Sequence, residues 1–276
     1  MQKKFKLSSI IVGILVVFWF LVCLTPVFFL ILCTLKDQKE IMSNGVFSLP
    51  KTFNISNYVE VFSGNIWHYF GNSILVMVVS LILLLMFSAF AAYPLSRWKF
   101  RFNKPIYSLI VACMSVPIHV TLLPIFMMMT NIGMYDNIWA LVGPYVAFNL
   151  PISVFILSTF MASVPKELEE AAFMDGCGRY GIFFRVMLPL AKPGLSTLLI
   201  YDGVNIWNEF SFALTLTQTS GNRTLPLAVN EFQGQYTMNI PMIMTVLAVS
   251  ILPMVLVFIF AKDKLIEGMM AGAVKG

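Results

Sequence analysis

Four polar side chains stand inside the long apolar run of residues 190–216: Asp202, Asn205, Asn208 and Glu209. At 100° per helical residue, Asp202, Asn205 and Glu209 fall within about 60° of one another, which predicts one polar stripe along a helix. A charge at the centre of a bilayer costs about 2.5–3.5 kcal/mol on insertion scales, so such a group faces a cavity or a partner. Carboxylates and amides in such a place can hydrogen-bond to the hydroxyl groups of a solute.

Two interpretations of these polar residues are open. In the first, they line or gate a path for a solute, and Glu209 could also carry a proton. In the second, they serve packing: Asp202 lies near the membrane edge and Glu209 makes a hydrogen bond at a subunit interface. Tyr145 and Asn149 are further candidates for the same cavity.

A second concentration of polar chemistry lies in the segment from Pro165 to Pro189. Four of the 13 acidic residues of the chain fall between Glu167 and Asp175. Proline suits the first helical position, and acidic side chains are favoured in the first turns by the helix dipole. Asp175-Gly176 and Gly178 then break the helix, and a second amphipathic piece follows. A plain connection between spans is usually shorter, so this helix–turn–helix is predicted to dock on a partner protein.

The composition indicates whether the chain is surrounded by water or by lipid. Of 276 residues, 59% are hydrophobic and 11% are charged, whereas an ordinary soluble domain is about 25% charged. The apolar runs are continuous, which predicts an all-α polytopic membrane protein rather than a β-barrel. The four cysteines lack paired spacing and the two histidines lack ligand-spaced partners, so no disulfide, metal site or nucleic-acid partner is expected.

Six membrane-spanning helices are predicted from the apolar runs. Fourteen of the 18 Lys and Arg residues fall in the segments on the side of the N-terminus and four on the other side. The positive-inside rule then places both termini and the charged segment in the cytoplasm. The predicted spans are residues 10–35, 69–95, 106–129, 138–161, 190–216 and 240–261. The predicted organisation is 1–68 as a first helix and external loop, 69–262 as a transmembrane core with a coupling loop at 163–189, and 263–276 as a cytoplasmic tail.

The charged segment carries a motif with fixed spacing. It reads Glu170-Ala171-Ala172, three residues, Gly176, nine residues, then Val186-x-Leu188-Pro189. This motif resembles the signature loop of the inner-membrane subunits of binding-protein-dependent ABC importers. Further pieces resemble the shorter, MalG-type permease of maltose-type carbohydrate importers, namely residues 92–97, 207–210, 223–226 and 271–276. The resemblance implies the type I ABC importer permease fold.

The resemblance also implies roles and partners. The coupling to an ATPase would use Glu169, Glu170, Ala171, Ala172, Asp175, Gly176, Leu188 and Pro189. The tail Gly272, Ala273, Val274, Lys275 and Gly276 would meet the ATPase pair. The expected partners are a second homologous permease, two ATPase subunits, an extracytoplasmic sugar-binding protein, a sugar substrate and membrane lipid, in a bacterial plasma membrane.

The sequence contains no recognisable site for binding or hydrolysing a nucleotide. No phosphate-binding glycine loop, catalytic triad or metal-binding spacing is present. The chain is therefore expected to have no catalytic residues and no cofactor, with ATP and Mg²⁺ bound by the partner ATPase. The alternatives are an ion-coupled secondary transporter, an ABC importer permease for a non-sugar solute, and a membrane scaffold or sensor that does not transport.

Overall fold

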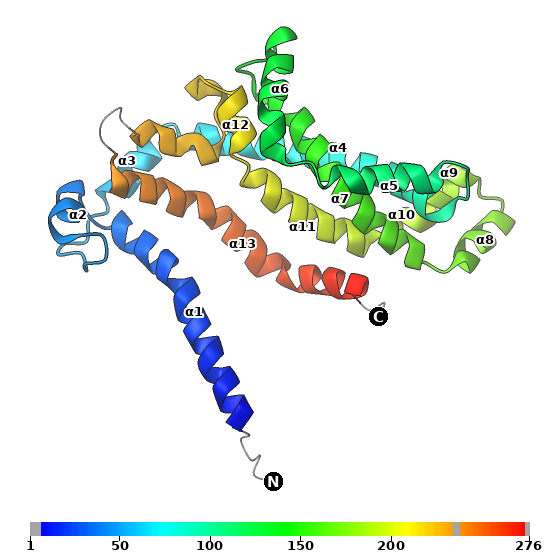
Figure 1. Ribbon diagram of the computed structural model, residues 1–276, viewed down its shortest axis with the longest axis horizontal. Coiled ribbons are helices and arrows are strands. Elements are labelled where there is room, and N and C mark those ends of the chain that lie inside the picture. Colours follow the sequence, from blue (N-terminus) through cyan, green and yellow to red (C-terminus); the bar gives the residue numbers. More distant parts are fainter. Residues whose placement is uncertain (1–6, 234–237, 274–276) are drawn as a thin grey trace. The chain divides into compact units, whose positions relative to one another are not determined.

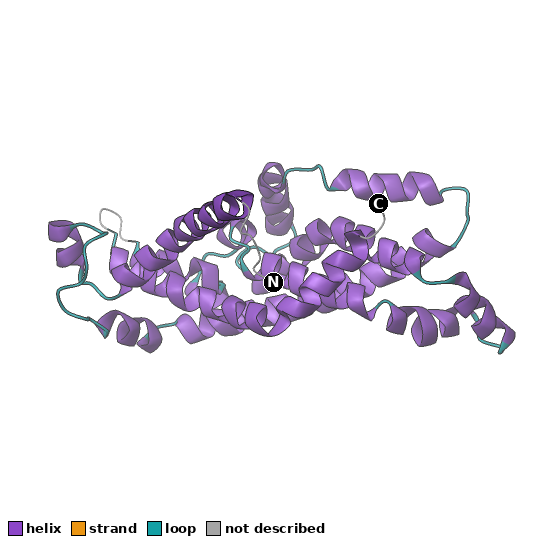
Figure 2. Cartoon of the chain, turned by 90° about the horizontal axis from the view of Figure 1, so that it is seen from below, coloured by secondary structure: helices purple, strands orange, loops and turns teal. Residues whose placement is uncertain are grey.

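The computed structural model describes residues 7–233 and 238–273. Throughout this part of the chain, helices are joined by loops and turns, without a strand (Figure 2). The prediction of an all-helical protein is confirmed. The contacts divide the chain into two compact units: Met1–Trp67 with Ala228–Leu252, and His68–Leu227 with Pro253–Gly276.

The first unit contains a long apolar helix and a polar connection. Its elements are α1 (Leu7–Thr34), α2 (Gln38–Asn44), α3 (Ser56–Ser63), most of η4 (Leu225–Phe232) and the first part of α13 (Ile240–Ala273). The side chains of α1 are largely exposed between Ile11 and Phe28, as expected for a helix that meets lipid.

A fully buried lysine organises the loop after α1. Lys36 is 0% exposed, and its ammonium group donates to Gly45 O at 3.3 Å, Val46 O at 3.0 Å and Ser48 Oγ at 3.0 Å. Three oxygen acceptors offset the cost of burying the charge. Asn57 closes the loop from the other side by donating to Thr34 O and Lys36 O, each at 2.9 Å.

The second unit contains the last part of α13 and the remaining helices. They are α4 (Ile66–Arg97), α5 (Asn103–Cys113), α6 (Ile118–Asn131), η1 (Ile138–Leu141), α7 (Val142–Ser163), α8 (Lys166–Met174), α9 (Arg179–Ile182), the π-helix η2 (Phe183–Met187), α10 (Leu188–Leu190), α11 (Lys192–Trp207), α12 (Ser211–Leu216) and η3 (Ser220–Asn222). Within this unit, α8 and α9 lie toward one end and α6 and α12 toward the other (Figure 1).

Each end of the second unit has its own apolar core. Near α6 and α12 the buried residues include Leu141, Phe212 and Leu216. Near α9 and η2 they include Leu157 and Phe183. Small residues also let helices approach closely: a Cβ at Gly194 on α11 would come within 2.8 Å of Phe160 Cγ on α7. The core near α9 positions the charged segment against α4 and α7.

Within the described residues, four helices are long and apolar enough to cross a membrane, and up to six spans result if each bent helix pair counts as one. The predicted third span is two helices, α5 and α6, bent by 94°. The bend follows from Pro117, the extended residue before α6, because proline interrupts the hydrogen-bond ladder of a helix.

The predicted fifth span of residues 190–216 is not one helix. α11 ends at Trp207 and α12 begins at Ser211. The side chain of Asn208 donates to Val204 O at 2.9 Å, and the carboxylate of Glu209 accepts from the backbone N–H of Phe212 at 2.8 Å. These side chains satisfy backbone groups at the two helix ends, which ends one helix and begins the next.

A carboxylate joins two loops near the α6–α12 end of the second unit. Asp136, in a left-handed conformation at φ 53°, accepts from the backbone N–H groups of Gln218 at 2.8 Å and Thr219 at 3.0 Å. Burial acts to raise the pKa of Asp136, but these bonds, with those from the Thr219 hydroxyl and the Asn222 amide, hold the pKa below its ordinary value of 3.8.

Candidate functional site

The charged segment folds as the predicted helix–turn–helix, and α8 is its first helix. Glu167 and Glu169 lie in the first turn of α8, where the dipole favours them. The helix also exposes large apolar side chains: Leu168 is 44% exposed, Phe173 65% and Met174 83%. An apolar surface next to charges, on a helix too short to span a membrane, is typical of a protein–protein contact.

Gly176 ends α8 in a Schellman motif. Its φ is +83°, its N–H donates to Phe173 O at 3.0 Å, and the N–H of Cys177 donates to Ala172 O at 3.0 Å. These two bonds satisfy carbonyl groups that the helix end leaves open. A residue with a Cβ is strained in the left-handed region, so this cap explains physically why the motif has a glycine at this position.

An ion pair fastens α8 to the end of α4. Glu169 is paired with Arg97, and their side chains are 18% and 4% exposed. Tyr93 on α4 donates its hydroxyl to the same carboxylate at 3.2 Å. Arg97 also donates to Val164 O at 2.9 Å and Met161 O at 3.4 Å, which belong to the end of α7 and the turn after it. One guanidinium group therefore connects α4, α7 and α8.

The other expected coupling residues differ in exposure. Glu170, Ala171 and Asp175 are exposed on α8 and its end, and Ala172 is half-buried against the core near α9. Leu188 and Pro189 belong to α10, which a single residue, Ala191, separates from α11. The structure thus fixes α8 through Glu169 and Ala172 and leaves most of its remaining surface exposed.

The polar residues of the apolar run do not form one stripe. Asp202 is 0% exposed, and Ser153 Oγ on α7 lies 2.9 Å from its Oδ2. Asn205 and Asn208 are exposed, and Glu209 lies beyond the end of α11. The predicted common helix face for Asp202, Asn205 and Glu209 is therefore wrong, because the helix ends before Glu209.

The two carboxylates have separate environments. Ser153 Oγ also lies 2.8 Å from Asn149 O, and Asp202 Oδ1 is buried without a hydrogen-bond partner among the described residues. The half-buried Glu209 accepts from Tyr145 Oη at 2.8 Å, besides the N–H groups of Phe212 and Ala213. Asp202 thus joins α7 to α11, and Glu209 joins α7 to the start of α12.

Some expected site residues lie at the edge of what the structure describes. Gly272 and Ala273 end α13, and only their backbone is described. Val274, Lys275 and Gly276 lie outside the described residues. Within the part of the chain that the structure describes, no group of three or more His, Cys, Asp or Glu side chains could hold a metal ion.

Sequence reasoning missed several residues of these arrangements. Tyr93 and Arg97 both lie in residues 92–97, which the sequence marks only as a piece that resembles the permease family, without a partner for either. Ser153 carried no signal, since a serine in an apolar helix most often bonds its own backbone. The opposite charges of Arg97 and Glu169 were the one available signal for this ion pair. Because 72 residues separate them in the sequence, that signal does not identify them as partners.

The geometry defines a multi-pass helical membrane protein that presents a charged helix outside its spans. The family model "Binding-protein-dependent transport system inner membrane component" matches residues 84–267. The chain belongs to this family of ABC transporter permeases, which are non-catalytic membrane subunits that work with a separate ATPase. The resemblance inferred from the motif is confirmed.

Known relatives match nearly the whole chain. It is 46% identical to the ABC transporter permease protein ORF2 of Caldicellulosiruptor sp., over 94% of each chain. It is 32% identical to the arabinooligosaccharides transport system permease protein AraQ of Halalkalibacterium halodurans, over 91% of each chain. The fold is shared with a crystal structure of a bacterial ABC transporter involved in the import of alginate, at a TM-score of 0.79 and 22% identity, covering 95% of this chain and 99% of that one.

Proposed function

We propose that this chain is one permease subunit of an ATP-driven importer for a sugar, most simply an oligosaccharide. It forms half of the translocation path together with a second, homologous permease. Two ATPase subunits bind ATP and Mg²⁺ in the cytoplasm, and an extracytoplasmic binding protein delivers the sugar. The chain crosses a bacterial plasma membrane six times with both termini in the cytoplasm. Relatives that transport oligosaccharides support the choice of substrate.

One observation carries the coupling part of this proposal. α8 exposes Leu168, Phe173 and Met174, while the pair of Glu169 with Arg97 fixes this helix to α4. The exposed face suits docking on an ATPase. Because Arg97 also holds the carbonyl groups of Met161 and Val164, a displacement of α8 moves the ends of α4 and α7 with it. In alternating access, closure of the ATPase pair then becomes a change in the helices around the path.

The residues of the path are proposed with different roles. Asn205 and Asn208 are exposed and are candidates for direct contact with sugar hydroxyl groups. Asp202 and Glu209 hold helices together, so they are assigned to the gate rather than to direct contact. The tail Gly272–Gly276 is proposed to contact the ATPase pair.

The coupling claim is tested by purification. The chain is isolated from the membrane with an affinity tag, and a nucleotide-binding subunit is expected to accompany it. Glu170→Lys reverses a charge on the exposed face of α8 and should reduce both the recovery of that subunit and the uptake of sugar. Lys192→Gln is the control, since Lys192 is exposed outside α8. Full recovery and full uptake with Glu170→Lys would refute the docking role.

A second test separates ATP-driven from ion-coupled transport. The single hydroxyl proton of Ser153 cannot serve both Asn149 O and Asp202, so a neutral donor at position 202 can donate to Ser153 Oγ while Ser153 donates to Asn149 O. Asp202→Asn should therefore keep most of the uptake, whereas an ion-coupled mechanism that uses Asp202 predicts its loss. Abolished uptake with Asp202→Asn, in a protein that still assembles with its ATPase, would favour the ion-coupled mechanism.

A further inference from the structure

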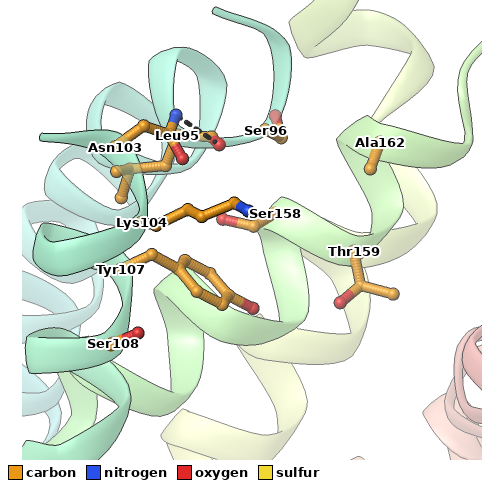
Figure 3. A pocket seen from close by; sticks show the side chains of 9 residues that line it. All are labelled: Leu95, Ser96, Asn103, Lys104, Tyr107, Ser108, Ser158, Thr159 and Ala162. Carbon is orange, nitrogen blue, oxygen red and sulfur yellow. Dashed lines mark hydrogen bonds between the residues drawn. The ribbon is translucent and has the colours of Figure 1, made fainter. Parts of the chain in front are cut away.

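Two cavities open beside the link between α4 and α5, and they share the lining residues Leu95, Ser96, Asn103 and Lys104. Their volumes of about 450 and 550 Å³ lie in the range of ligand pockets. We call the two together the basic pocket. Figure 3 shows Lys104 and Tyr107 of α5 extending toward Ser158 and Thr159 of α7.

Each half of the basic pocket contains a buried polar atom that lacks a partner. Ser158, 5% exposed, lines the first cavity, and its Oγ has no hydrogen-bond partner among the described residues. Arg97, with a side chain 4% exposed, lines the second, and its Nη2 is likewise unpartnered. Buried donors usually find partners, so a guanidinium N–H and a hydroxyl that lack partners on residues lining a pocket point to a ligand with acceptor oxygens.

The charge around the pocket identifies an anion. Lys99, Arg101, Lys104 and Lys166 line it and are exposed, and neither set of lining residues includes an acidic side chain. The first turn of α5, which holds Lys104, adds the positive end of a helix dipole. A phosphate group fits this set of donors, because its oxygens can accept from arginine, lysine and hydroxyl groups together.

The position of the pocket beside an apolar helix face indicates which kind of molecule contains that phosphate. α5 continues from Lys104 into an apolar face on which Ile106 is 41% and Leu109 is 67% exposed, as expected for a helix in contact with acyl chains. Basic pockets at the cytoplasmic ends of membrane helices recognise acidic headgroups. We propose that the basic pocket binds the phosphodiester of an acidic phospholipid such as phosphatidylglycerol. Because Arg97 also holds Glu169, the bound headgroup fixes the residue that fastens α8.

Native mass spectrometry of the purified transporter complex tests this inference through the lipid that stays on this chain. Phosphatidylglycerol should be retained in preference to phosphatidylcholine. Each basic residue near the surface contributes about fivefold to such binding, so the double variant Arg101→Gln/Lys104→Gln should lower retention roughly 30-fold. Lys192→Gln removes a basic charge outside the pocket and should leave retention unchanged.

A further variant separates the pocket from charge alone. Ala162 is an exposed lining residue of the first cavity, and Ala162→Trp fills that space without changing charge, so it should also lower retention. Equal retention of both lipids, or equal loss in the double variant and in Lys192→Gln, would overturn the inference. Complete displacement of the lipid by excess inorganic phosphate would assign the pocket to a soluble phosphate instead. The readout needs no transport, so its failure is distinct from failure of the proposed function.

Discussion

Removing the charge of Glu169 should uncouple α8 from α4 without unfolding the spans. Glu169→Gln keeps the shape of the side chain but takes away the ion pair with Arg97, whose side chain is 4% exposed. A hydrogen bond to a charged group contributes about 1.5–3 kcal/mol. The lower part of that range applies, because the side chain of Glu169 is 18% exposed and water screens it in part. A loss of about 2 kcal/mol lowers the ratio of α8 held against α4 to α8 released from it roughly 30-fold.

The assay is sugar-stimulated ATP hydrolysis by the complex in proteoliposomes. Glu169→Gln should lower the stimulation while basal hydrolysis by the ATPase persists. The matched control is Glu167→Gln, since Glu167 stands in the same first turn but is exposed, and this variant should behave like the wild type.

A double-mutant cycle completes this test. Arg97→Gln alone should be more damaging, because Arg97 also loses its bonds to Val164 O and Met161 O. The double variant with Glu169→Gln should then be little worse than Arg97→Gln alone, since contacting residues are non-additive. Equal effects of Glu167→Gln and Glu169→Gln, or full additivity in the cycle, would refute the assignment of the ion pair to coupling.

Three further outcomes are expected. Gly176→Ala strains the left-handed cap by about 1–2 kcal/mol and should reduce uptake, whereas Gly178→Ala, at an extended position with open space around it, should not. Gly194→Ala forces a Cβ to within 2.8 Å of Phe160. This variant should lower the free energy of unfolding of the complex by about 1–3 kcal/mol, measured by thermal unfolding. An unchanged free energy of unfolding would contradict the prediction and show that Phe160 moves freely. The carboxylate of Asp136 has a lowered pKa, so its bonds stabilise the loop fully above pH 3.8 and the effect is lost as pH falls through the lowered value. Hydrogen exchange in the 216–222 loop should rise in that acidic range, and Asp136→Asn should raise exchange at neutral pH and flatten this dependence; a flat wild-type profile would contradict it.

Local patterns predicted the elements well. Continuous hydropathy located the long apolar helices, because a span needs about 20 apolar residues whatever surrounds it. The charged segment was also predicted in outline, since Pro165, the acidic first turn and Gly176 are local signals of helix start and end. These features depend on residues a few positions apart and so can be read from sequence.

Long-range pairings could not be predicted in this way. The resemblance assigned Glu169 to coupling with the ATPase and gave no sign of its partner Arg97, which lies on a helix 72 positions earlier. Glu209 looked like part of a continuous helix, yet its carboxylate satisfies the backbone of Phe212 and Ala213 instead. A carboxylate and the backbone carbonyl groups of a helix compete for the same N–H groups. Which of them wins depends on local geometry, and the spacing of polar residues in the sequence does not reveal it.

The buried Lys36 bears on the order in which the chain can assemble. Its acceptors lie 9–12 residues away, and Asn57 closes on backbone carbonyls 21 and 23 residues back. Loops of this length cost little entropy to close, so the segment after α1 can form its contacts soon after emerging from the ribosome. Gln38, in contrast, donates to Met238 O, 200 residues later. The first unit therefore begins to fold early in synthesis and is completed only when α13 arrives, after nearly all of the second unit has been made.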